Sequence, residues 1–151
     1  MYVYRICRAA QRALDGEGAR LYGGRWNSPG RPVVYTSTSL ALAALEYLIH
    51  VDPEDVPPDL IALTIEIPDD IDAETADAAA LPAGWEQVPE PPACKAIGEA
   101  WANAGRVLAL RVPAAPVPEE MNLLLNPRHS GASRVRIANE RPFFYDPRLL
   151  A

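Results

Sequence analysis

Residues 23–50 read GGRWNSPGRPVVYTSTSLALAALEYLIH and predict a loop, a strand and a helix in close succession. Glycine and proline at both ends of Tyr22–Gly30 indicate a loop, and the short β-branched run Val33–Thr36 indicates a strand. Ser37–Ser39 offers hydroxyls that can cap a helix, and the apolar run Leu40–Val51 predicts that helix. This order brings an arginine, a tyrosine and a glutamate into one short stretch of chain.

The rest of the chain predicts more strands than helices. Further strands are predicted at Val3–Cys7, Leu60–Ile67, Val107–Val112, Met121–Leu125, Arg134–Ile137 and Phe143–Tyr145. The other segments are predicted as a short helix and loop (Arg8–Arg20), a surface helix or loop (Asp69–Ala80), an extended connection (Pro82–Pro92), a helix ended by Gly105 (Cys94–Ala104) and a turn (Pro113–Pro118). Because strands and helices do not alternate regularly, we expect a single α+β domain over residues 1–151 rather than a doubly wound fold.

Composition and charge exclude several classes of protein. The chain has 151 residues, of which 49% are hydrophobic and 23% charged, which is typical of a globular domain. A net charge of −6 argues against direct nucleic-acid binding and against an anionic membrane surface. The start of the sequence lacks the apolar stretch of a signal peptide. Cys7 and Cys94 are far apart and form no CxxC motif, which disfavours a disulfide framework or zinc site and favours the reducing cytoplasm.

Glu46 is the one acidic residue in the apolar run from Ser39 to His50. One interpretation is that it occupies the solvent-facing stripe of the helix, where carboxylates are usually found. The other is that it is held in a pocket, which costs several kcal/mol unless a partner compensates. A cationic ligand or a cationic transition state is such a partner.

Four other residues have both a functional and a purely structural interpretation. Arg25 carries a planar fork suited to phosphate oxygens, or it is an exposed loop residue next to a core Trp26. Tyr35 offers a flat face to a cationic ring, or it is an ordinary half-buried strand tyrosine. Asn126 can bind a sugar or an amide, although an Asn before proline usually makes a turn, and Arg5 can point into a cleft or to the surface.

Other reaction classes are poorly supported. His50 and His129 lack metal-ligand spacing, so we expect no metal. No G-x-S-x-G motif is present for a hydrolase serine. A Cys–His nucleophile pair stays open, although neither cysteine lies in a supporting motif.

The motifs together resemble the RES domain from Tyr4 to Leu150. They are YRICR, the run DGEGARLYGGRWNSPGRPVVYTSTSLALAALEYLIH, LIALTIEIPDD, LPAGW, AIGEAW, NLLLNP and FFYDPRLL. The resemblance implies an α+β fold of mostly antiparallel sheets, like that of ADP-ribosyltransferase toxins. It also implies a toxin of a type II toxin–antitoxin module that is neutralised by an Xre-type helix-turn-helix antitoxin. Its positions for the functional arginine, tyrosine and glutamate fall on Arg25, Tyr35 and Glu46.

The resemblance further implies that NAD⁺ is the substrate, without a metal. Cleavage of its nicotinamide–ribose bond by water or phosphate would deplete NAD⁺ and halt growth, with Glu46 stabilising the positive charge that develops on the sugar. The residues expected to bind NAD⁺ are Arg5, Arg25, Trp26, Asn27, Tyr35 and Asn126.

One departure from the family concerns its serine. The chain has Ala114 and Ala115, or alternatively Ala93–Lys95, where a serine is expected, and Ser130 and Ser133 are nearby alternatives. The missing serine keeps open a catalytically weakened binding module of the same fold. A protein mono-ADP-ribosyltransferase also stays open, because it would use the same site residues and NAD⁺. The sequence also leaves open whether the protein forms a homo-oligomer or a toxin–antitoxin hetero-oligomer.

Overall fold

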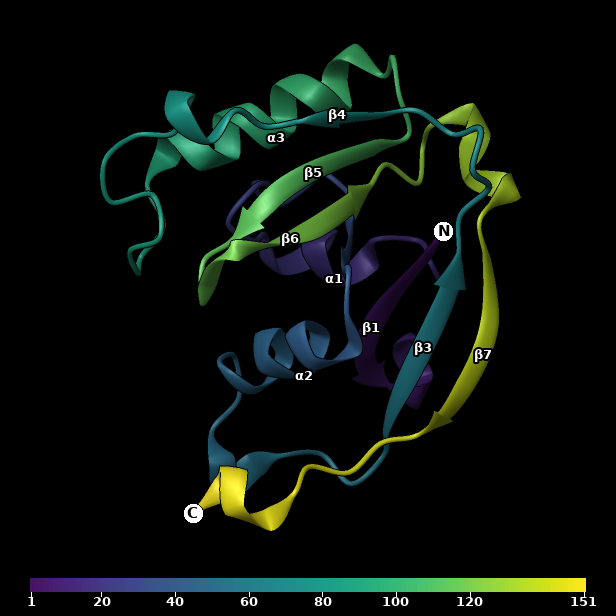
Figure 1. The fold of residues 1–151 in the computed structure, drawn as a ribbon, viewed down its shortest axis with the longest axis vertical. Helices are drawn as coiled ribbons and strands as arrows, with labels where there is room; N and C mark the ends of the chain where they lie inside the picture. Colours follow the sequence, from purple (N-terminus) through teal and green to yellow (C-terminus); the bar gives the residue numbers. More distant parts are fainter.

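Seven strands form one mixed sheet in the computed structural model, which describes residues 1–151 (Figure 1). The strands are β1 (Tyr2–Arg8), β2 (Val34–Ser37), β3 (Leu60–Glu66), β4 (Ala73–Thr75), β5 (Ala109–Ala114), β6 (Val117–Leu125) and β7 (Arg136–Pro142). Across the sheet their order is β4-β5-β6-β2-β1-β3-β7, and every neighbouring pair is antiparallel except β4 and β5. With the helices α1 (Glu17–Tyr22), α2 (Leu40–Leu48) and α3 (Pro92–Ala104), this confirms the α+β prediction.

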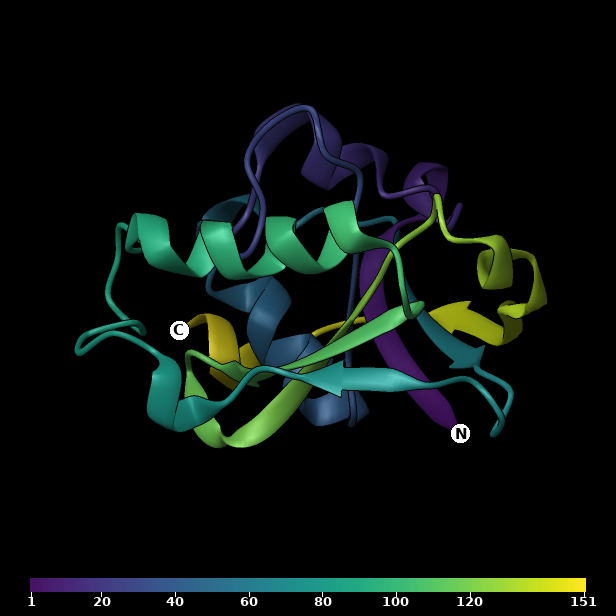
Figure 2. The ribbon, with the colours of Figure 1, turned by 90° about the horizontal axis from the view of Figure 1, so that it is seen from above.

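Helices α2 and α3 pack on the same face of this sheet. Tyr35 of β2 lies opposite Leu124 of β6, and Leu124 belongs to the core cluster under α3. Ser37 lies opposite both Asn122 of β6 and Tyr4 of β1, and Tyr4 packs against the cluster under α2. Figure 2 shows α3 running alongside β4 and β5. The side chains of Tyr35, Ser37 and Asn122 therefore all point to the face that carries the two helices.

The sheet also buries its other face, which explains the continuous apolar run in β3. Leu60 and Ala62 join the cluster under α2, whereas Ile61 and Leu63 join a cluster on the opposite face. Side chains alternate between the two faces of a strand. A strand that is covered on both faces must therefore be apolar at successive positions.

Local sequence signals set the ends of the two longer helices. The Ser39 side chain accepts a hydrogen bond from the backbone N–H of Leu42 at 3.1 Å, as expected of an N-cap. Helix α3 begins with Pro92 and ends at Gly105, whose φ of 59° lies in the left-handed region. No helix of the protein combines the length and the apolar content needed to cross a membrane.

Several predicted elements were wrong in place or type. Phe143–Tyr145 is not a strand, and one longer strand, β7, replaces the two predicted near the end of the chain. Residues 73–75 form β4 in the segment predicted as a helix or loop, because they pair with β5. The predicted turn at Pro113–Pro118 is shorter, since β6 already begins at Val117. Between β1 and β2, the helix α1 forms at the end of the predicted helix-and-loop segment.

Candidate active site

Glu46 extends from α2 toward the sheet and is half-buried. Its Oε1 accepts a hydrogen bond from the side-chain amide of Asn122 in β6, with a distance of 2.6 Å. Of the two interpretations that the sequence left open, the structure therefore shows the inward-facing one.

Ser37 extends this contact to a third element. Its hydroxyl donates to Oδ1 of Asn122 at 2.7 Å, and the side chains of both residues are almost fully buried, with 4% and 8% exposed. A chain of hydrogen bonds thus runs from β2 through β6 to the carboxylate on α2. Neither Ser37 nor Asn122 was predicted as a site residue, because only the register of β2 and β6 brings them together.

The Tyr35 hydroxyl is held by two hydrogen bonds from the glycine-bounded loop. It donates to Oδ1 of Asn27 at 2.6 Å and accepts from the backbone N–H of Trp26 at 3.2 Å. A Cβ atom on Gly24 would lie 2.6 Å from the same hydroxyl oxygen, so the ring reaches this position only because residue 24 is glycine. The loop that carries Arg25 is in this way tied directly to the tyrosine.

The environment of Tyr35 shifts the pKa of its hydroxyl. Burial raises the pKa of its hydroxyl well above the ordinary value, and the hydrogen bond from Trp26 lowers it. The charges of Glu90 and Glu46 raise this pKa further, while Arg25 lowers it. Tyr35 and Asn122 are also diagonal neighbours on paired strands, a separation of about 7–8 Å.

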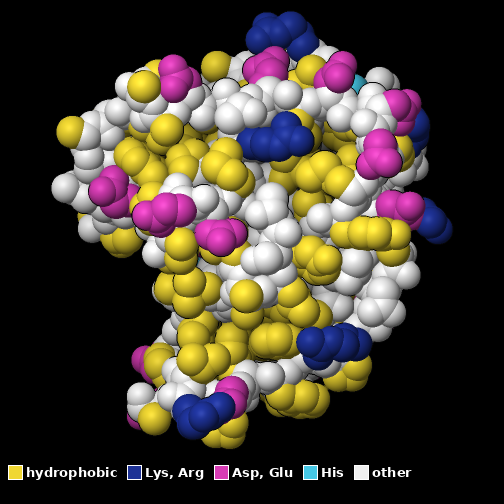
Figure 3. Space-filling model, in the orientation of Figure 1, with side chains coloured by type: hydrophobic (Ala, Val, Ile, Leu, Met, Phe, Trp, Pro, Cys, Tyr) yellow, Lys and Arg dark blue, Asp and Glu magenta, His cyan; other side chains and the backbone are white.

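Arg25 is held by the segment that precedes α3. Its Nη1 donates to the backbone carbonyls of Trp85 and Gln87, at 2.7 and 2.9 Å. The rings of Trp26 and Trp85 pack beside each other with centroids 6.2 Å apart. A guanidinium has five N–H donors, so Arg25 keeps donors for an anionic ligand. In Figure 3 the left outline is indented at the level of α2, below the part formed by α3 and the segment that precedes it.

Helix α3 fixes the loop from its other side. Lys95 donates to the carbonyl of Gly24 at 2.8 Å, and Glu99 accepts from the backbone N–H of Ser28 at 2.8 Å. Between them, a Cβ on Gly98 would lie 1.9 Å from the carbonyl oxygen of Trp26, so the loop backbone lies directly against the helix. Arg25 therefore sits in a loop whose backbone is fixed on both sides of it.

The structure places two of the predicted NAD⁺-binding residues away from this cluster. Arg5 follows Tyr4 in β1, so its side chain points to the other face of the sheet, which it shares with Cys7 and which does not carry α2 and α3. Asn126 follows β6, about 13 Å along the chain from Asn122, and its amide is used by Ala102 and Arg128 in a buried turn. Arg25, Trp26 and Asn27 lie in the loop that is hydrogen-bonded to Tyr35, and Glu46 is linked through Asn122 to the sheet face that carries Tyr35.

Two of the predicted binding residues, Trp26 and Asn27, are buried and make their contacts within the protein. Asn27 is completely buried, and its amide donates to the carbonyls of Ala19, Ser28 and Arg31. Trp26 is 2% exposed and packs in the core under α3. Both shape the loop rather than offer polar groups to a ligand.

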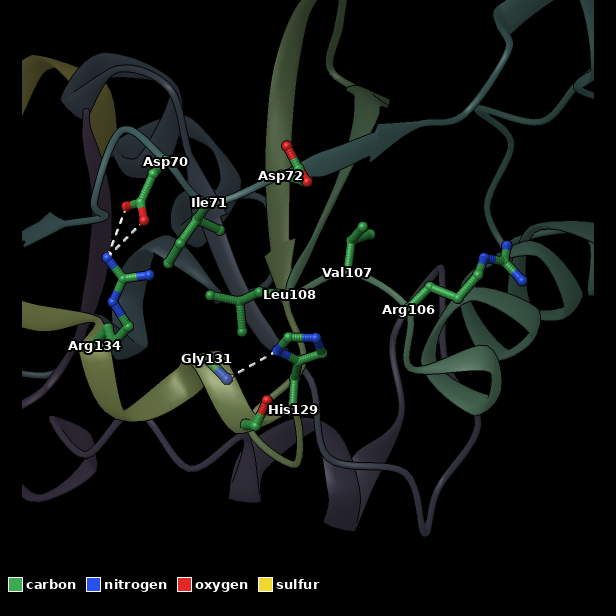
Figure 4. A pocket seen from close by; sticks show the side chains of 10 residues that line it. Asp70, Ile71, Asp72, Arg106, Val107, Leu108, His129, Gly131 and Arg134 are labelled. Atoms are coloured by element: carbon green, nitrogen blue, oxygen red, sulfur yellow. Dashed lines mark hydrogen bonds and ion pairs between the residues drawn. The ribbon is translucent and has the colours of Figure 1, made fainter.

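Ser130 and Ser133 belong to a different part of the molecule. They lie in a 3₁₀ turn (Ser130–Arg134), and Ser130 lines a cavity of about 360 Å³ (Figure 4). There Arg134 pairs with Asp70 at 2.7 Å, and Nδ1 of His129 accepts from the backbone N–H of Gly131. None of Arg25, Tyr35 and Glu46 lines this cavity. At one position where the family serine was expected, Ala114 is fully buried in β5.

Comparison with known proteins identifies the family to which this chain belongs. The family model described as RES domain matches residues 2–146. The chain belongs to the RES domain family, as its motifs predicted.

Its relatives are toxins. It is 40% identical over 139 residues to the "Prs ADP-ribosylating toxin" of Sphingobium sp. (strain YBL2), covering 91% of this chain and 86% of that protein. It is 40% identical over 151 residues to "Toxin Res" of Pseudomonas putida, covering 99% of both. Among solved structures, the M. tuberculosis MbcT–MbcA toxin–antitoxin complex contains a chain with the same fold. Its TM-score is 0.77 at 23% identity, covering 99% of this chain and 86% of that one.

Proposed function

We propose that this protein is the toxin of a toxin–antitoxin module and that it cleaves the nicotinamide–ribose bond of NAD⁺. Its membership of a family whose named relatives are toxins supports the first part. The observation that carries the second part is the half-buried Glu46 carboxylate, held by Asn122 on the sheet face that also carries Tyr35.

Glu46 supplies the electrostatic part of the reaction. Breaking the bond between nicotinamide and ribose leaves the electron pair on nicotinamide and builds positive charge on the sugar. A carboxylate that is already oriented toward that sugar stabilises the transition state more than the ground state. Water or phosphate then attacks the anomeric carbon, and the proton of the attacking group passes to solvent.

Tyr35 and Arg25 hold the substrate. The Tyr35 hydroxyl is already bound by Asn27 and Trp26, so its ring has a fixed plane against which nicotinamide can pack. The N–H donors of Arg25 that the segment before α3 leaves free fit the pyrophosphate oxygens. In this assignment Arg25 and Tyr35 bind and orient NAD⁺, and Glu46 stabilises the developing charge.

The direct test is NAD⁺ consumption by the purified protein and by the variant Glu46→Gln. Removing one preorganised electrostatic group lowers the rate by about 10²–10³-fold at such sites, so we expect the variant to fold normally and to lose nearly all NAD⁺ cleavage. Glu54→Gln, which removes the same charge from an exposed turn, is the matched control. Full activity of Glu46→Gln would contradict the proposal.

Product analysis identifies the acceptor. With water, the products are nicotinamide and ADP-ribose; with phosphate, ADP-ribose carries a phosphate at the anomeric carbon. Chromatography of reactions with and without phosphate separates the two.

A second candidate function is mono-ADP-ribosylation of a protein. It is favoured by one observation, the name of the Sphingobium relative as an ADP-ribosylating toxin. Incubation with labelled NAD⁺ and a cell lysate tests it, since transfer leaves the label on a protein band and hydrolysis does not.

The proposed partner is an Xre-type antitoxin, and the proposed site of action is the cytoplasm. The similar solved structure is a toxin–antitoxin complex, which supports an antitoxin for this chain. Expression of the protein alone is expected to stop growth and deplete cellular NAD⁺, and co-expression with its antitoxin to restore both. If expression leaves growth and NAD⁺ unchanged, a non-catalytic binding module is the better description.

A further inference from the structure

Asn122 is the buried polar residue that links Glu46 to the sheet. Both ends of its side-chain amide are used: Nδ2 donates to Oε1 of Glu46 at 2.6 Å, and Oδ1 accepts from the Ser37 hydroxyl at 2.7 Å. The three residues come from β6, α2 and β2. Glu46 takes part in no ion pair, so this amide is the polar group that fixes its carboxylate.

The hydrogen-bonding chemistry of Glu46, Asn122 and Ser37 allows the Asn122 side-chain amide only one orientation. An ionised carboxylate accepts hydrogen bonds and donates none, so the NH₂ end of Asn122 must face Glu46. The carbonyl end then faces Ser37 and needs a donor, which the hydroxyl supplies. Because Ser37 and Asn122 are directly opposite on paired strands, their side chains lie on the same face. The sheet thereby sets the direction of the amide, and the amide sets the position of the carboxylate.

We infer that Asn122 is a positioning residue for Glu46 and that Ser37 orients the Asn122 amide for this role. The inference rests on the proposed cleavage of NAD⁺. The hydrogen bond occupies Oε1 and leaves Oε2 without a hydrogen bond from the protein, so one oxygen is held and the other is free to face the substrate. A glutamate at the surface of a helix otherwise samples several rotamers. Holding it in one of them supplies the preorganisation that electrostatic catalysis requires.

A space-filling role and a positioning role for Asn122 predict different activities for variants at this residue. Asn122→Asp keeps the size and shape of the side chain but places a second carboxylate against Glu46. If Asn122 only filled space, Asn122→Ala would lower the urea midpoint and leave the kcat of the folded protein unchanged. If it positions Glu46, the repulsion displaces that carboxylate, and Asn122→Asp is impaired at least as much as Asn122→Ala.

The experiment compares kcat and KM for NAD⁺ in the wild type and in Asn122→Ala, Asn122→Asp and Ser37→Ala. Misplacing a reacting group by about 1 Å costs up to about 100-fold in rate. We therefore expect kcat to fall by roughly 10–100-fold for both Asn122 variants, while KM changes little because neither residue binds NAD⁺. The effect of Ser37→Ala is expected to be smaller and in the same direction.

Thr36→Ala is the matched control for Ser37→Ala. Thr36 is the neighbouring residue in β2, is equally buried and donates its hydroxyl to the carbonyl of Leu123 at 2.7 Å, but it faces the other side of the sheet. It is expected to lower the urea midpoint without changing kcat. A fall of kcat in Thr36→Ala as large as that in Ser37→Ala would overturn the role of Ser37.

A second measurement does not depend on NAD⁺. Urea unfolding of the wild type, Asn122→Ala, Glu46→Ala and the double variant measures the coupling between the two side chains. We expect the double variant to be more stable than the sum of the single effects predicts. Additive effects, or unchanged kcat in Asn122→Asp, would overturn the inference. Coupling without any NAD⁺ cleavage by the wild type would instead overturn the proposed function.

Discussion

Gly98→Ala tests whether α3 positions the loop that carries Arg25. The added Cβ would lie 1.9 Å from the Trp26 carbonyl oxygen and 2.8 Å from its carbonyl carbon, so a backbone segment rather than a flexible side chain has to move. Movement of the loop also weakens the contacts of Lys95 with Gly24 and of Glu99 with the loop backbone.

The magnitudes decide the sign of the effect. Replacing Gly by Ala inside a helix gains up to about 1 kcal/mol. Overpacking costs about 1–3 kcal/mol, and each hydrogen bond to a charged group contributes about 1.5–3 kcal/mol. A net loss of about 2–4 kcal/mol lowers the Tm by roughly 4–16 °C in a domain of this size. Under the proposed function, displacement of Arg25 by about 1 Å is expected to lower NAD⁺ cleavage by up to about 100-fold.

Differential scanning fluorimetry measures the Tm, and loss of NAD⁺ measures the activity. The matched control is Gly18→Ala in α1, where an added Cβ meets no atom within 4 Å. This control is expected to keep its activity and to gain a little stability. If Gly98→Ala has the Tm and activity of the wild type, the docking of the loop on α3 is not as described.

Three further predictions concern other parts of the chain. Ser39→Ala removes the cap of α2 and is expected to cost about 1 kcal/mol, a fall in Tm of roughly 2–4 °C by circular dichroism; an unchanged Tm would contradict the capping role. Burial raises the pKa of the Cys7 and Cys94 thiols, and the thiolate is the reactive form. Both are therefore expected to react with iodoacetamide slowly in the native protein and quickly after denaturation, and fast labelling of the native protein would show that they are accessible. The hydrogen bond from Arg134 lowers the pKa of Asp70 in the folded protein. Its stabilising effect is therefore present above the unfolded-state pKa and is lost as the pH falls through the folded-state pKa. The Tm values of the wild type and Arg134→Ala are expected to converge at acidic pH, and a constant difference down to pH ~2 would contradict the ion pair.

Local chemistry made much of the fold predictable. The cap at Ser39 and the stop at Gly105 depend on residues within one turn of the helix end, so their positions can be inferred from the sequence. β3 was predicted from the alternating pattern of Leu60–Ile67 and from Pro68, which ends it. In contrast, β4 is three residues long and pairs in parallel with β5, a partner more than thirty positions away. The ends of β7 likewise follow from its register with β3.

The sequence identified some of the candidate site residues correctly and others wrongly. Arg25, Tyr35 and Glu46 are close together in the sequence and match the RES family, and these two features were enough to make them candidates. The same reasoning named Arg5, which the alternation along β1 turns to the opposite face. It named Asn126, whose amide closes a turn.

By itself, the sequence determined the order of loop, strand and helix, the start of α2, the end of α3 and the family, because these depend on neighbouring residues or on the motifs as a set. Only the tertiary structure decided what holds the candidate site residues in place. Asn122 reaches Glu46 across 76 positions of the chain, and Lys95 reaches Gly24 across 71. Such contacts follow from strand register and from the packing of α3 on the loop, and neither is encoded in any one local stretch of residues.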